Sequence, residues 1–595
     1  MPQLLNSGKG CFIAIILFSL LQLCPFRLMW QVGGDDLSYL SHAFTIALDF
    51  DLDYANEPAT RKSGNGRLAS HPLGPGVMAA PFVALFSAAD RLSGNPVIGN
   101  HALYSGSWSY FGFLFSAVFY YLSGISLYYR SMLRVCFVPP GTAFLVLASS
   151  GSAYFAMNRF TLGHSFEFFL LAAIFCGTVR VWSLGAAKGV AVGFSEALLP
   201  SLSVAAAVIF SLFVRPANVN VLLLPPLVLA ALLCLDERVE WKLFFHSLWQ
   251  LYFWTCILAV LFALFNHSLY GVYYPTMTAL YKKSAAFSRY GIDPDNSGRT
   301  VVALVTQVTA NLRYLPNLLF GSEHGLLYSN PLTLVGTFLL LLRLARSTAL
   351  RLAPKWTLLL LTLGYCGLPV AVVLLWKTTA GSYGYRYLFS IFPLGVTGYL
   401  LWLRYASAWS RSALWLNRAL IGLCLFSVFS QLFFSMTQKL EVREGVNTFG
   451  INYKASANGY DMALVGELVN PRAWLLMLAK KAPGFVAFNV VQYAGVDPAG
   501  VASKGGISED YRRAVGKMKE LQHGSLVFSP GDYLLQISVL FLYIICFAVF
   551  YCRRGPLPEA SLLSAGSAVL GGHDADRRPE REGDAVHRDA AQELQ

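Results

Sequence analysis

The sequence predicts an all-α polytopic membrane protein, and three observations support this class. The chain has 595 residues, of which 55% are hydrophobic and only 13% are charged, whereas soluble domains are about 25% charged. Mean hydropathy is +0.52. Apolar runs long enough to cross a bilayer recur along the chain. This composition excludes a soluble enzyme, a disordered chain and a collagen-like repeat.

Twelve apolar runs are predicted to be transmembrane helices, because about 20 apolar residues cross the hydrocarbon core. They are 11–30, 107–128, 140–157, 164–183, 199–214, 218–235, 246–266, 327–345, 356–376, 387–403, 419–436 and 533–551. The first run is not expected to be a cleaved signal peptide, since Met29-Trp30-Gln31 is a poor cleavage site.

Segment 72–90 is apolar but contains Pro72, Pro75 and Pro81, and the positive-inside rule decides its placement. If it does not cross, one set of loops becomes strongly basic and faces the cytoplasm. That set holds Arg130, Arg134, Arg180, Lys188, Arg238, Lys242, Arg343, Arg346, Arg351, Lys355, Arg404, Arg411, Arg418, Arg553 and Arg554. We therefore predict that 72–90 is a helix at the outer membrane interface and that both termini are cytoplasmic.

These spans predict the domain organisation. Residues 1–436 form a transmembrane core, in which 31–106 and 267–326 are the first and second outer loops. The other predicted parts are an extracytoplasmic segment, 437–532, that could pack as a small α/β cap, the last transmembrane helix, 533–551, and a polar tail, 552–595, expected to be disordered and cytoplasmic.

The net charge of +13 does not predict a nucleic-acid partner, because basic residues in a membrane protein first report its topology. Nine of the ten cysteines lie in apolar runs or at their ends. Neither a disulfide framework nor a zinc cage is expected.

A pair of acids follows the first span directly. Asp35 and Asp36 lie in the run Gly33-Gly34-Asp35-Asp36-Leu37-Ser38-Tyr39, and carboxylates at the mouth of a membrane helix are costly unless something uses them. One of them could take a proton from an attacking hydroxyl as a general base. The alternative is an interfacial acid pair that caps the next helix.

Cations and histidines mark the outer ends of later segments. Arg215 lies between two spans, and its guanidinium can bind two phosphate oxygens at once, although it could also reach to lipid headgroups. His71 precedes the 72–90 segment, and Arg386 stands among small and aromatic residues. His164 and Glu167 are three residues apart, so they share a helix face and could form either a polar wall or a structural cap.

Glu323 and His324 form a further outer pair. Two adjacent candidate ligands are a weak signal for a metal. No cofactor is required by the sequence, and a divalent metal is an open alternative.

The polar clusters share one predicted side of the membrane. A proton-coupled transporter more often places its ionisable groups near the midplane. The pattern here favours a reaction at the membrane interface on a lipid-borne substrate.

Asp35-Asp36-x-x-Tyr39 resembles the Asp-Glu-x-x-Tyr motif of the GT-C glycosyltransferases, in particular the bacterial relatives of the protein O-mannosyltransferases and of the lipid A aminoarabinose transferase. That family has a proline-led interfacial helix, which 72–90 resembles. Gly384-x-Arg386-Tyr387 is similar to another of its motifs. The resemblance covers about 30–400. The chain departs from the family pattern at three positions. Asp36 stands where Glu is usual, His71 where one branch has a basic residue that binds phosphate, and His164 where an acid is common.

The resemblance implies a GT-C fold and the transfer of a sugar from a polyprenyl-phosphate donor to an envelope lipid, glycan or protein, with inversion at the anomeric carbon. It implies that Asp35, assisted by Asp36, is the base, and that the leaving phosphate contacts Arg215, His71 and Arg386. The implied sugar and acceptor pocket consists of Tyr39, His164, Glu167, Glu323 and His324.

The expected location is the bacterial inner membrane, with the active site outside the cytoplasm and membrane lipids as neighbours. Two alternatives stay open. One is an envelope enzyme of the O-antigen ligase or polymerase kind, and the other is a flippase or transporter of lipid-linked glycans.

Overall fold

The structure is a computed structural model. It describes residues 35–54, 71–92, 94, 108–157, 160–188, 194–233, 241–275, 297–321, 325–346, 352–376, 385–405, 411–438, 454–456, 459–461, 491, 494, 496–503, 512 and 515. The chain divides into two compact units, Met1–Tyr551 and Cys552–Gln595, and every described residue belongs to the first.

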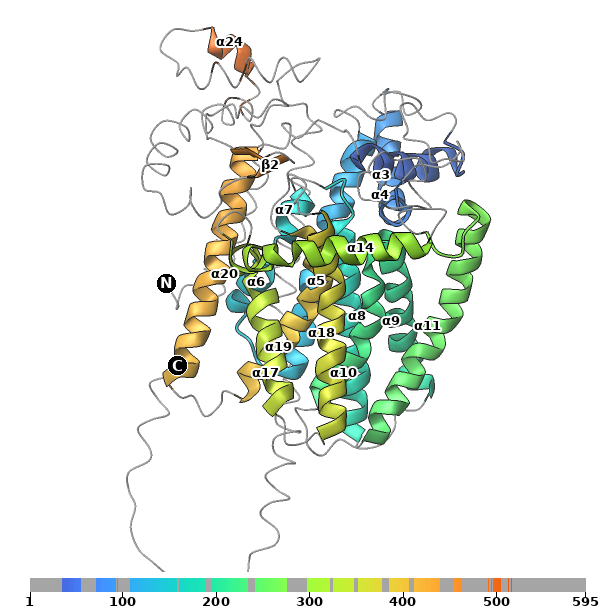
Figure 1. Cartoon of the computed structure of the whole chain (residues 1–595). Helices are drawn as coiled ribbons and strands as arrows, with labels where there is room; N and C mark the ends of the chain where they lie inside the picture. The colour runs from blue at the N-terminus through green and yellow to red at the C-terminus, as the bar shows by residue number, and fades with distance from the viewer. Residues whose placement is uncertain are drawn as a thin grey trace, which may run out of the picture. The chain divides into compact units, whose positions relative to one another are not determined.

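Six helices of the described chain are long and apolar enough to cross a membrane, as expected for an integral membrane protein (Figure 1). They are α5 (Trp108–Val135), α8 (His164–Lys188), α9 (Phe194–Val214), α11 (Trp241–Tyr270), α18 (Leu352–Trp376) and α20 (Arg411–Gln438). Each corresponds to one predicted span. The predicted spans 11–30 and 533–551 lie outside the described residues.

The predicted span 140–157 is wrong as a single helix. It consists of α6 (Pro140–Ala148) and α7 (Ser152–Met157). At the break Gly151 has a φ of +83°, a left-handed conformation that favours glycine. The Ser150 hydroxyl accepts a hydrogen bond from the Ser152 amide at 3.3 Å. Hydropathy alone could not show this turn, because glycine tolerates the left-handed backbone and serine hydroxyls satisfy the local backbone inside an apolar run.

Three other predicted spans are helical but begin irregularly. They comprise η4 (Pro216–Leu223) with α10 (Leu224–Leu233), α16 (Leu326–Ser329) with η6 (Leu332–Gly336) and α17 (Thr337–Arg346), and η7 (Arg386–Ile391) with α19 (Phe392–Tyr405). The η4 and η7 segments are 3-10 turns, and η6 is a π-helical turn. Such turns leave backbone groups free for other partners, so they are common at functional positions in membrane proteins.

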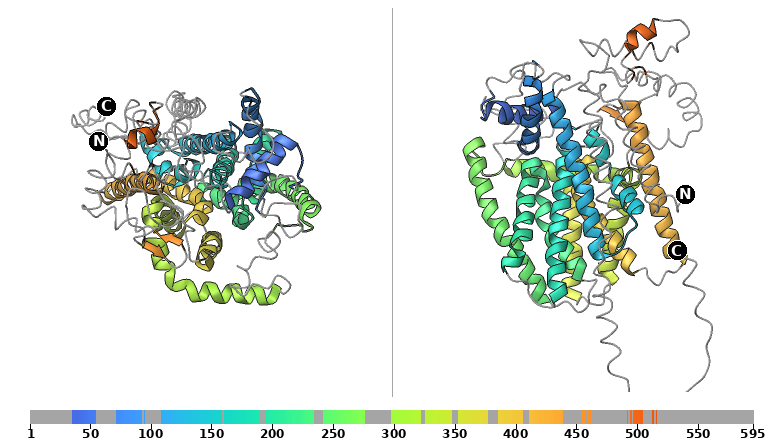
Figure 2. Two further views of the ribbon diagram at one scale, coloured as in Figure 1. Left: turned by 90° about the horizontal axis from the view of Figure 1, so that it is seen from above. Right: turned by 180° about the vertical axis from the view of Figure 1, so that it is seen from behind.

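Antiparallel packing brings sequence-distant helix ends together. α8 and α9 are neighbours, so the start of α8 meets the end of α9 (Figure 2). At the opposite end of the bundle, Arg404 Nη1 donates to the Val135 carbonyl at 3.0 Å, which joins the end of α19 to the end of α5.

The segment predicted as the first outer loop, 31–106, contains α3 (Asp35–Phe44), η2 (Thr45–Asp49, a π-helical turn) and α4 (Gly74–Leu92). The helix predicted over 72–90 is therefore present as α4. It packs against α3, α5 and α9, and it is not among the six described helices that could cross a membrane. Its depth in the membrane stays a prediction.

The run Gly74-Pro75-Gly76 at the start of α4 contacts three elements at once. A methyl group on Gly74 would lie 2.5 Å from the Val214 amide, and one on Gly76 would lie 2.3 Å from the His42 Cβ. A methyl group on Gly163, just before α8, would lie 2.8 Å from the Pro75 ring. Small residues are needed at these positions because the backbones approach too closely for a side chain.

The remaining described elements are α14 (Ser297–Asn311), η5 (Leu312–Tyr314), α15 (Leu315–Phe320), the strands β1 (Lys454–Ser456) and β2 (Gly459–Asp461), and α24 (Pro498–Ala502). β1 and β2 pair antiparallel, with Ala455 opposite Tyr460. The α/β cap predicted over 437–532 stays a prediction, because most of that segment lies outside the described residues.

We predict that Gly76→Ala destabilises the protein by roughly 1–3 kcal/mol, since the added methyl group overpacks the contact between α4 and α3. The matched control is Gly364→Ala in α18, where an added methyl group meets nothing within 4 Å. That change should leave stability unchanged or raise it by up to about 1 kcal/mol. Thermal unfolding in one detergent compares the two, and equal stability of both variants would contradict the close-contact interpretation.

Candidate functional site

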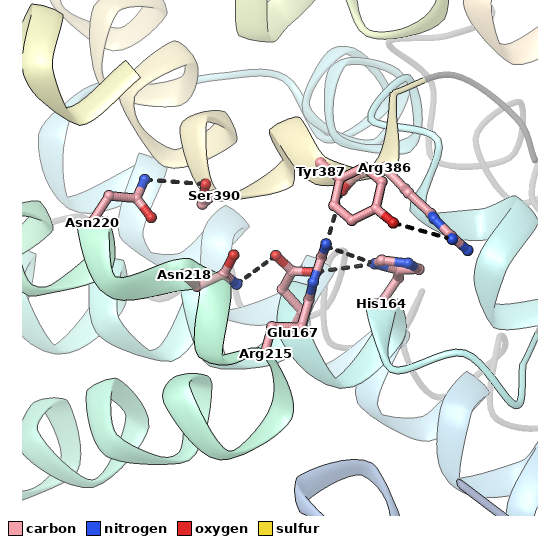
Figure 3. A network of polar contacts seen from close by, with 8 residues as sticks. All are labelled: His164, Glu167, Arg215, Asn218, Asn220, Arg386, Tyr387 and Ser390. Atoms are coloured by element: carbon pink, nitrogen blue, oxygen red, sulfur yellow. Dashed lines mark hydrogen bonds and ion pairs between the residues drawn. The ribbon is translucent and has the colours of Figure 1, made fainter. Parts of the chain in front are cut away.

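A buried polar network lies where the start of α8, the end of α9 and the turn η7 meet (Figure 3). These three segments are far apart in the sequence. The network consists of His164, Glu167, Arg215, Asn218, Asn220, Arg386, Tyr387 and Ser390.

Glu167 is the centre of the network, and its side chain is fully buried. Its Oε2 accepts from Arg215 Nη1 at 2.9 Å and from His164 Nδ1 at 3.0 Å. Its Oε1 accepts from Asn218 Nδ2 at 2.7 Å. A buried carboxylate is tolerated when it is paired and hydrogen-bonded, and these three donors meet that condition. The carboxylate can only accept from His164, so Nδ1 carries the proton in that contact.

Arg215 connects α9 to η7. Its side chain is only 11% exposed. Its Nη1 also donates to the Arg386 carbonyl at 3.2 Å, and its guanidinium lies 4.7 Å from the centre of the Tyr387 ring. The Arg386 guanidinium lies 5.2 Å from the same ring. One tyrosine ring therefore contacts both guanidinium groups, and cation–π attraction holds them near each other.

A second chain of hydrogen bonds fixes η7 against α18. Asn220 Nδ2 donates to Ser390 Oγ at 3.1 Å and to the Tyr365 carbonyl at 3.2 Å. The Tyr365 hydroxyl in turn donates to the Ser390 carbonyl. These bonds hold the turn that carries Arg386 and Tyr387 in one position.

The local sequence explains why Arg215 and Asn218 point into the network. Pro216 at the first position of η4 lacks an amide hydrogen, and α9 ends before it. Asn218 has a non-helical backbone (φ −82°, ψ 29°) inside the 3-10 turn. Its side chain is thereby placed to donate across to Glu167 on α8.

Tyr39 and His71, two predicted site residues of the segment predicted as the first outer loop, lie in a separate cluster. The Tyr39 and His71 rings lie edge to face, with centroids 5.3 Å apart, and His71 is 3% exposed. His42 Nε2 donates to the His71 carbonyl at 2.9 Å, and the His42 Nδ1 pairs with the Tyr54 hydroxyl. Since a carbonyl can only accept, the proton of the neutral His42 ring is on Nε2, and Nδ1 accepts from Tyr54.

The structure thus brings together His164, Glu167, Arg215 and Arg386 from the predicted set. It places Tyr39 and His71 in the histidine cluster. α3 begins at Asp35, but the side chains of Asp35 and Asp36 lie outside the description. Glu323 and His324 also lie outside the described residues. The Gly74-Pro75-Gly76 run lies between the two clusters, because it contacts His42 on one side and Gly163 and Val214 on the other.

Several network residues were missed by sequence reasoning. Asn218 and Asn220 are polar positions within a predicted span, which was a usable signal, and Tyr387 follows the predicted Arg386. His42 and Tyr54 had no sequence signal. The two partners of His42, Tyr54 and His71, are 12 and 29 residues away from it in the chain, so no local pattern connects them.

Within the described residues, no group of three or more His, Cys, Asp or Glu side chains could hold a metal ion. The sequence left a divalent metal at Glu323 and His324 open, and this alternative is not tested because both residues lie outside the described part of the chain.

Two mainly apolar clefts lie near these clusters. One cleft of about 350 Å³ runs between α9 and α11 and is lined by aliphatic and phenylalanine side chains, including Phe213 and Phe265. A second, of about 530 Å³, is lined by Leu73, Val77, Phe265 and residues within and after η2. The two clefts share Phe265. Phe213 stands two residues before Arg215, so the first cleft ends beside the backbone that carries this cation.

No family model and no curated protein matches the chain. Two chains of solved structures match, both of the oligosaccharyltransferase of Archaeoglobus fulgidus: one in the apo form and one in complex with an inhibitory peptide and a dolichol-phosphate. For each, the sequence identity is 12%, the TM-score is 0.42, and the match covers 73% of this chain and 56% of that chain. This chain thus spans little more than half the length of those proteins.

We predict that acid destabilises the first outer loop through His42. Burial lowers the pKa of His42 from 6.5 to about 4, so between these values the unfolded chain binds the proton more readily than the folded one. The stability from neutral His42 is present above pH 6.5 and is lost as the pH falls toward 4, by about 3 kcal/mol in all.

Thermal unfolding of the wild type and of His42→Gln between pH 4 and pH 8 isolates this contribution, because other acids titrate in both proteins. The glutamine amide can still donate to the His71 carbonyl. The wild type should lose more stability on acidification than the variant. Parallel curves would show that His42 does not titrate as its burial implies.

We predict that Glu167→Gln destabilises the bundle by roughly 3–5 kcal/mol, because it leaves the Arg215 guanidinium buried without its opposite charge. Glu196→Gln, at an exposed position in the first turn of α9, is the matched control and should change stability by less than about 1 kcal/mol, because solvent screens the interactions of an exposed carboxylate. Thermal unfolding of both variants is the measurement. Similar effects in the two would mean that the Glu167 carboxylate does not stabilise the network.

Proposed function

We propose that the protein is a membrane glycosyltransferase that takes a sugar from a polyprenyl-phosphate donor. The observation that carries the proposal is the convergence of Glu167, Arg215 and Arg386 at one end of the bundle. The sequence marks each of these residues separately as a candidate for donor or sugar binding. Two arginines beside one carboxylate suit a phosphate group, since guanidinium groups bind phosphate oxygens in pairs.

In this proposal the two arginines stabilise the leaving phosphate. An acceptor hydroxyl attacks the anomeric carbon of the sugar, the bond from that carbon to the phosphate oxygen breaks, and the hydroxyl proton passes to Asp35. Polyprenyl phosphate leaves with the bonding electrons, and the anomeric carbon inverts. Negative charge grows on the phosphate as this bond breaks, so fixed cations there lower the barrier. Glu167 keeps Arg215 in place.

The histidine cluster supports the assignment of Asp35. α3 begins at Asp35 and also contains His42. The His42 ring is hydrogen-bonded to the Tyr54 hydroxyl and to the His71 carbonyl, which lie before and after segment 55–70. Gly76 packs against the same helix, and its neighbours contact the residues beside His164 and Arg215. We propose on this basis that Asp35 reaches the same active site as Arg215. Asp36 and His71 assist the base and the phosphate in this proposal.

The apolar cleft between α9 and α11 offers a path for the donor's hydrocarbon chain. Both helices are among those that can cross a membrane, so the cleft opens toward lipid. A polyprenyl chain in it would have its phosphate near the end of α9, where Arg215 is found. The acceptor is an envelope lipid, glycan or protein.

The sidedness is also part of the proposal. The network lies at the starts of α8 and η7, whereas Arg134, Arg346 and Arg404 lie in the last turns of α5, α17 and α19. Under the positive-inside rule the basic ends face the cytoplasm. The active site then faces the outside of a bacterial inner membrane, and both termini are cytoplasmic.

We predict that Asp35→Asn lowers transfer about 10²–10⁴-fold, as expected for loss of a general base. Purified protein in nanodiscs would be given radiolabelled polyprenyl-phosphate sugars and envelope acceptors, and donor consumption would be measured with Asp36→Asn alongside. Donor that is still consumed by both variants contradicts the mechanism and favours an O-antigen ligase-like enzyme. Donor that moves across the membrane without being consumed favours a flippase.

We predict that Arg215→Lys lowers transfer about 10²-fold, because lysine keeps the charge but loses the paired donors that hold the phosphate. Arg180→Lys is the matched control, since Arg180 is exposed near the other end of α8. The same donor-consumption assay compares them. Equal rates for the two variants would remove Arg215 from the phosphate site.

A further inference from the structure

The segment α14–η5–α15 runs along the outside of the helix bundle, across the direction of α18 (Figures 1 and 2). Its first helix, α14, packs against α18, and α15 packs against α16. Asn311 Nδ2, at the end of α14, donates to the Leu374 carbonyl at 2.8 Å. Leu374 lies in the last turn of α18, which is one of the six helices that can cross a membrane. This bond places the end of α14 beside the last turn of a helix that can cross a membrane.

Over 301–310, where the structure describes its side chains, the outward face of α14 is uncharged. The exposed residues recur at helical spacing: Val301, Val302, Val305, Thr306, Thr309 and Ala310. The valines among them are 58%, 66% and 59% exposed. Water-facing surfaces usually contain about 25–35% charged residues, and none of these six is charged.

The residue types on this face also fit an apolar environment. Five of the six exposed side chains are valine or threonine, which have low helix propensity in water because their branched β-carbons restrict rotamers. The opposite face is held by the protein, since Val308 packs against the hydrophobic core. A helix supported on one side by α18 and apolar on the other needs a second apolar neighbour.

The turn after α14 carries the side chains that are typical of a headgroup region. Arg313 lies 5.1 Å from the Tyr314 ring, and Tyr314 is 39% exposed. Leu312 and Phe320 are 50% and 56% exposed. Tyrosine is enriched at the membrane–water boundary, and an exposed arginine there can approach lipid phosphates.

We propose that α14–η5–α15 is a membrane-interface segment, with its valine face inserted among acyl chains and Arg313 at the lipid phosphates. The occupant of this face is the lipid bilayer rather than a second protein. Helices of this kind lie in the plane of the interface and bury one face by roughly 5–10 Å. This inference does not depend on the proposed enzymatic activity.

The test uses the full-length protein in nanodiscs with tryptophan introduced at Val302, and separately at Val305 in case the first variant folds poorly. The fluorescence of the added tryptophan is the emission of the variant minus that of the wild type. It would be compared in three lipids: one with acyl chains brominated near the carbonyl end, one with chains brominated near the methyl end, and one without bromine. We expect about a two-fold loss of the added emission with the shallow bromines, a smaller loss with the deep ones, and little effect of aqueous iodide.

Val496→Trp is the control, because Val496 is 47% exposed in the predicted extracytoplasmic segment; it should respond to iodide and not to bromine. Iodide quenching without bromine quenching at Val302 would overturn the proposal, because the face would then be in water. No response to either quencher would also overturn it. The face would then be covered by protein, and cross-linking would show whether this is a second copy of the chain.

Discussion

The close backbone contacts at Gly74-Pro75-Gly76 are the constraint on which the candidate site depends. Gly76 lets α4 approach α3 at His42, Pro75 packs against Gly163 just before α8, and Gly74 meets the end of α9. Side chains at either glycine would separate these elements. Because His164 and Arg215 directly follow the contacted residues, the same small run sets the distance between the first outer loop and the buried network.

The network itself shows how a membrane bundle accommodates charge. Isolated charges in a membrane are costly, and Glu167 is stabilised by three donors, one from its own helix α8 and two from the junction of α9 and η4. Its pairing leaves Arg215 fixed between a carboxylate, a backbone carbonyl and an aromatic ring. A cation held in this way does not need to reorganise when a phosphate becomes more negative, which is the property required of a transition-state stabiliser.

The irregular turns and the network are connected. η4 and η7 each replace the first turns of a predicted span with a 3-10 turn, and they contribute Asn218, Asn220, Arg386 and Tyr387. In a regular helix the backbone groups would point along the helix axis and bond within the helix, whereas these 3-10 turns leave backbone groups free for other partners. At the same end of the bundle, α14 lies across α18 and provides the surface that we assign to lipid. The chemistry and the membrane contact are therefore both proposed for one end of the molecule.

The sequence by itself determined the membrane class, the six long helices, the α4 helix and the residue types of the candidate site, because hydropathy, helix length and charge are local properties. It did not determine the break at Gly151 or the turns before α10 and α19, since hydropathy predicts an apolar span without showing whether its helix is continuous. Only the tertiary structure decided that Glu167 pairs with Arg215, 48 residues away, and that His42 joins Tyr54 to His71. These partners meet through helix packing, and their spacing in the chain contains no information about that packing.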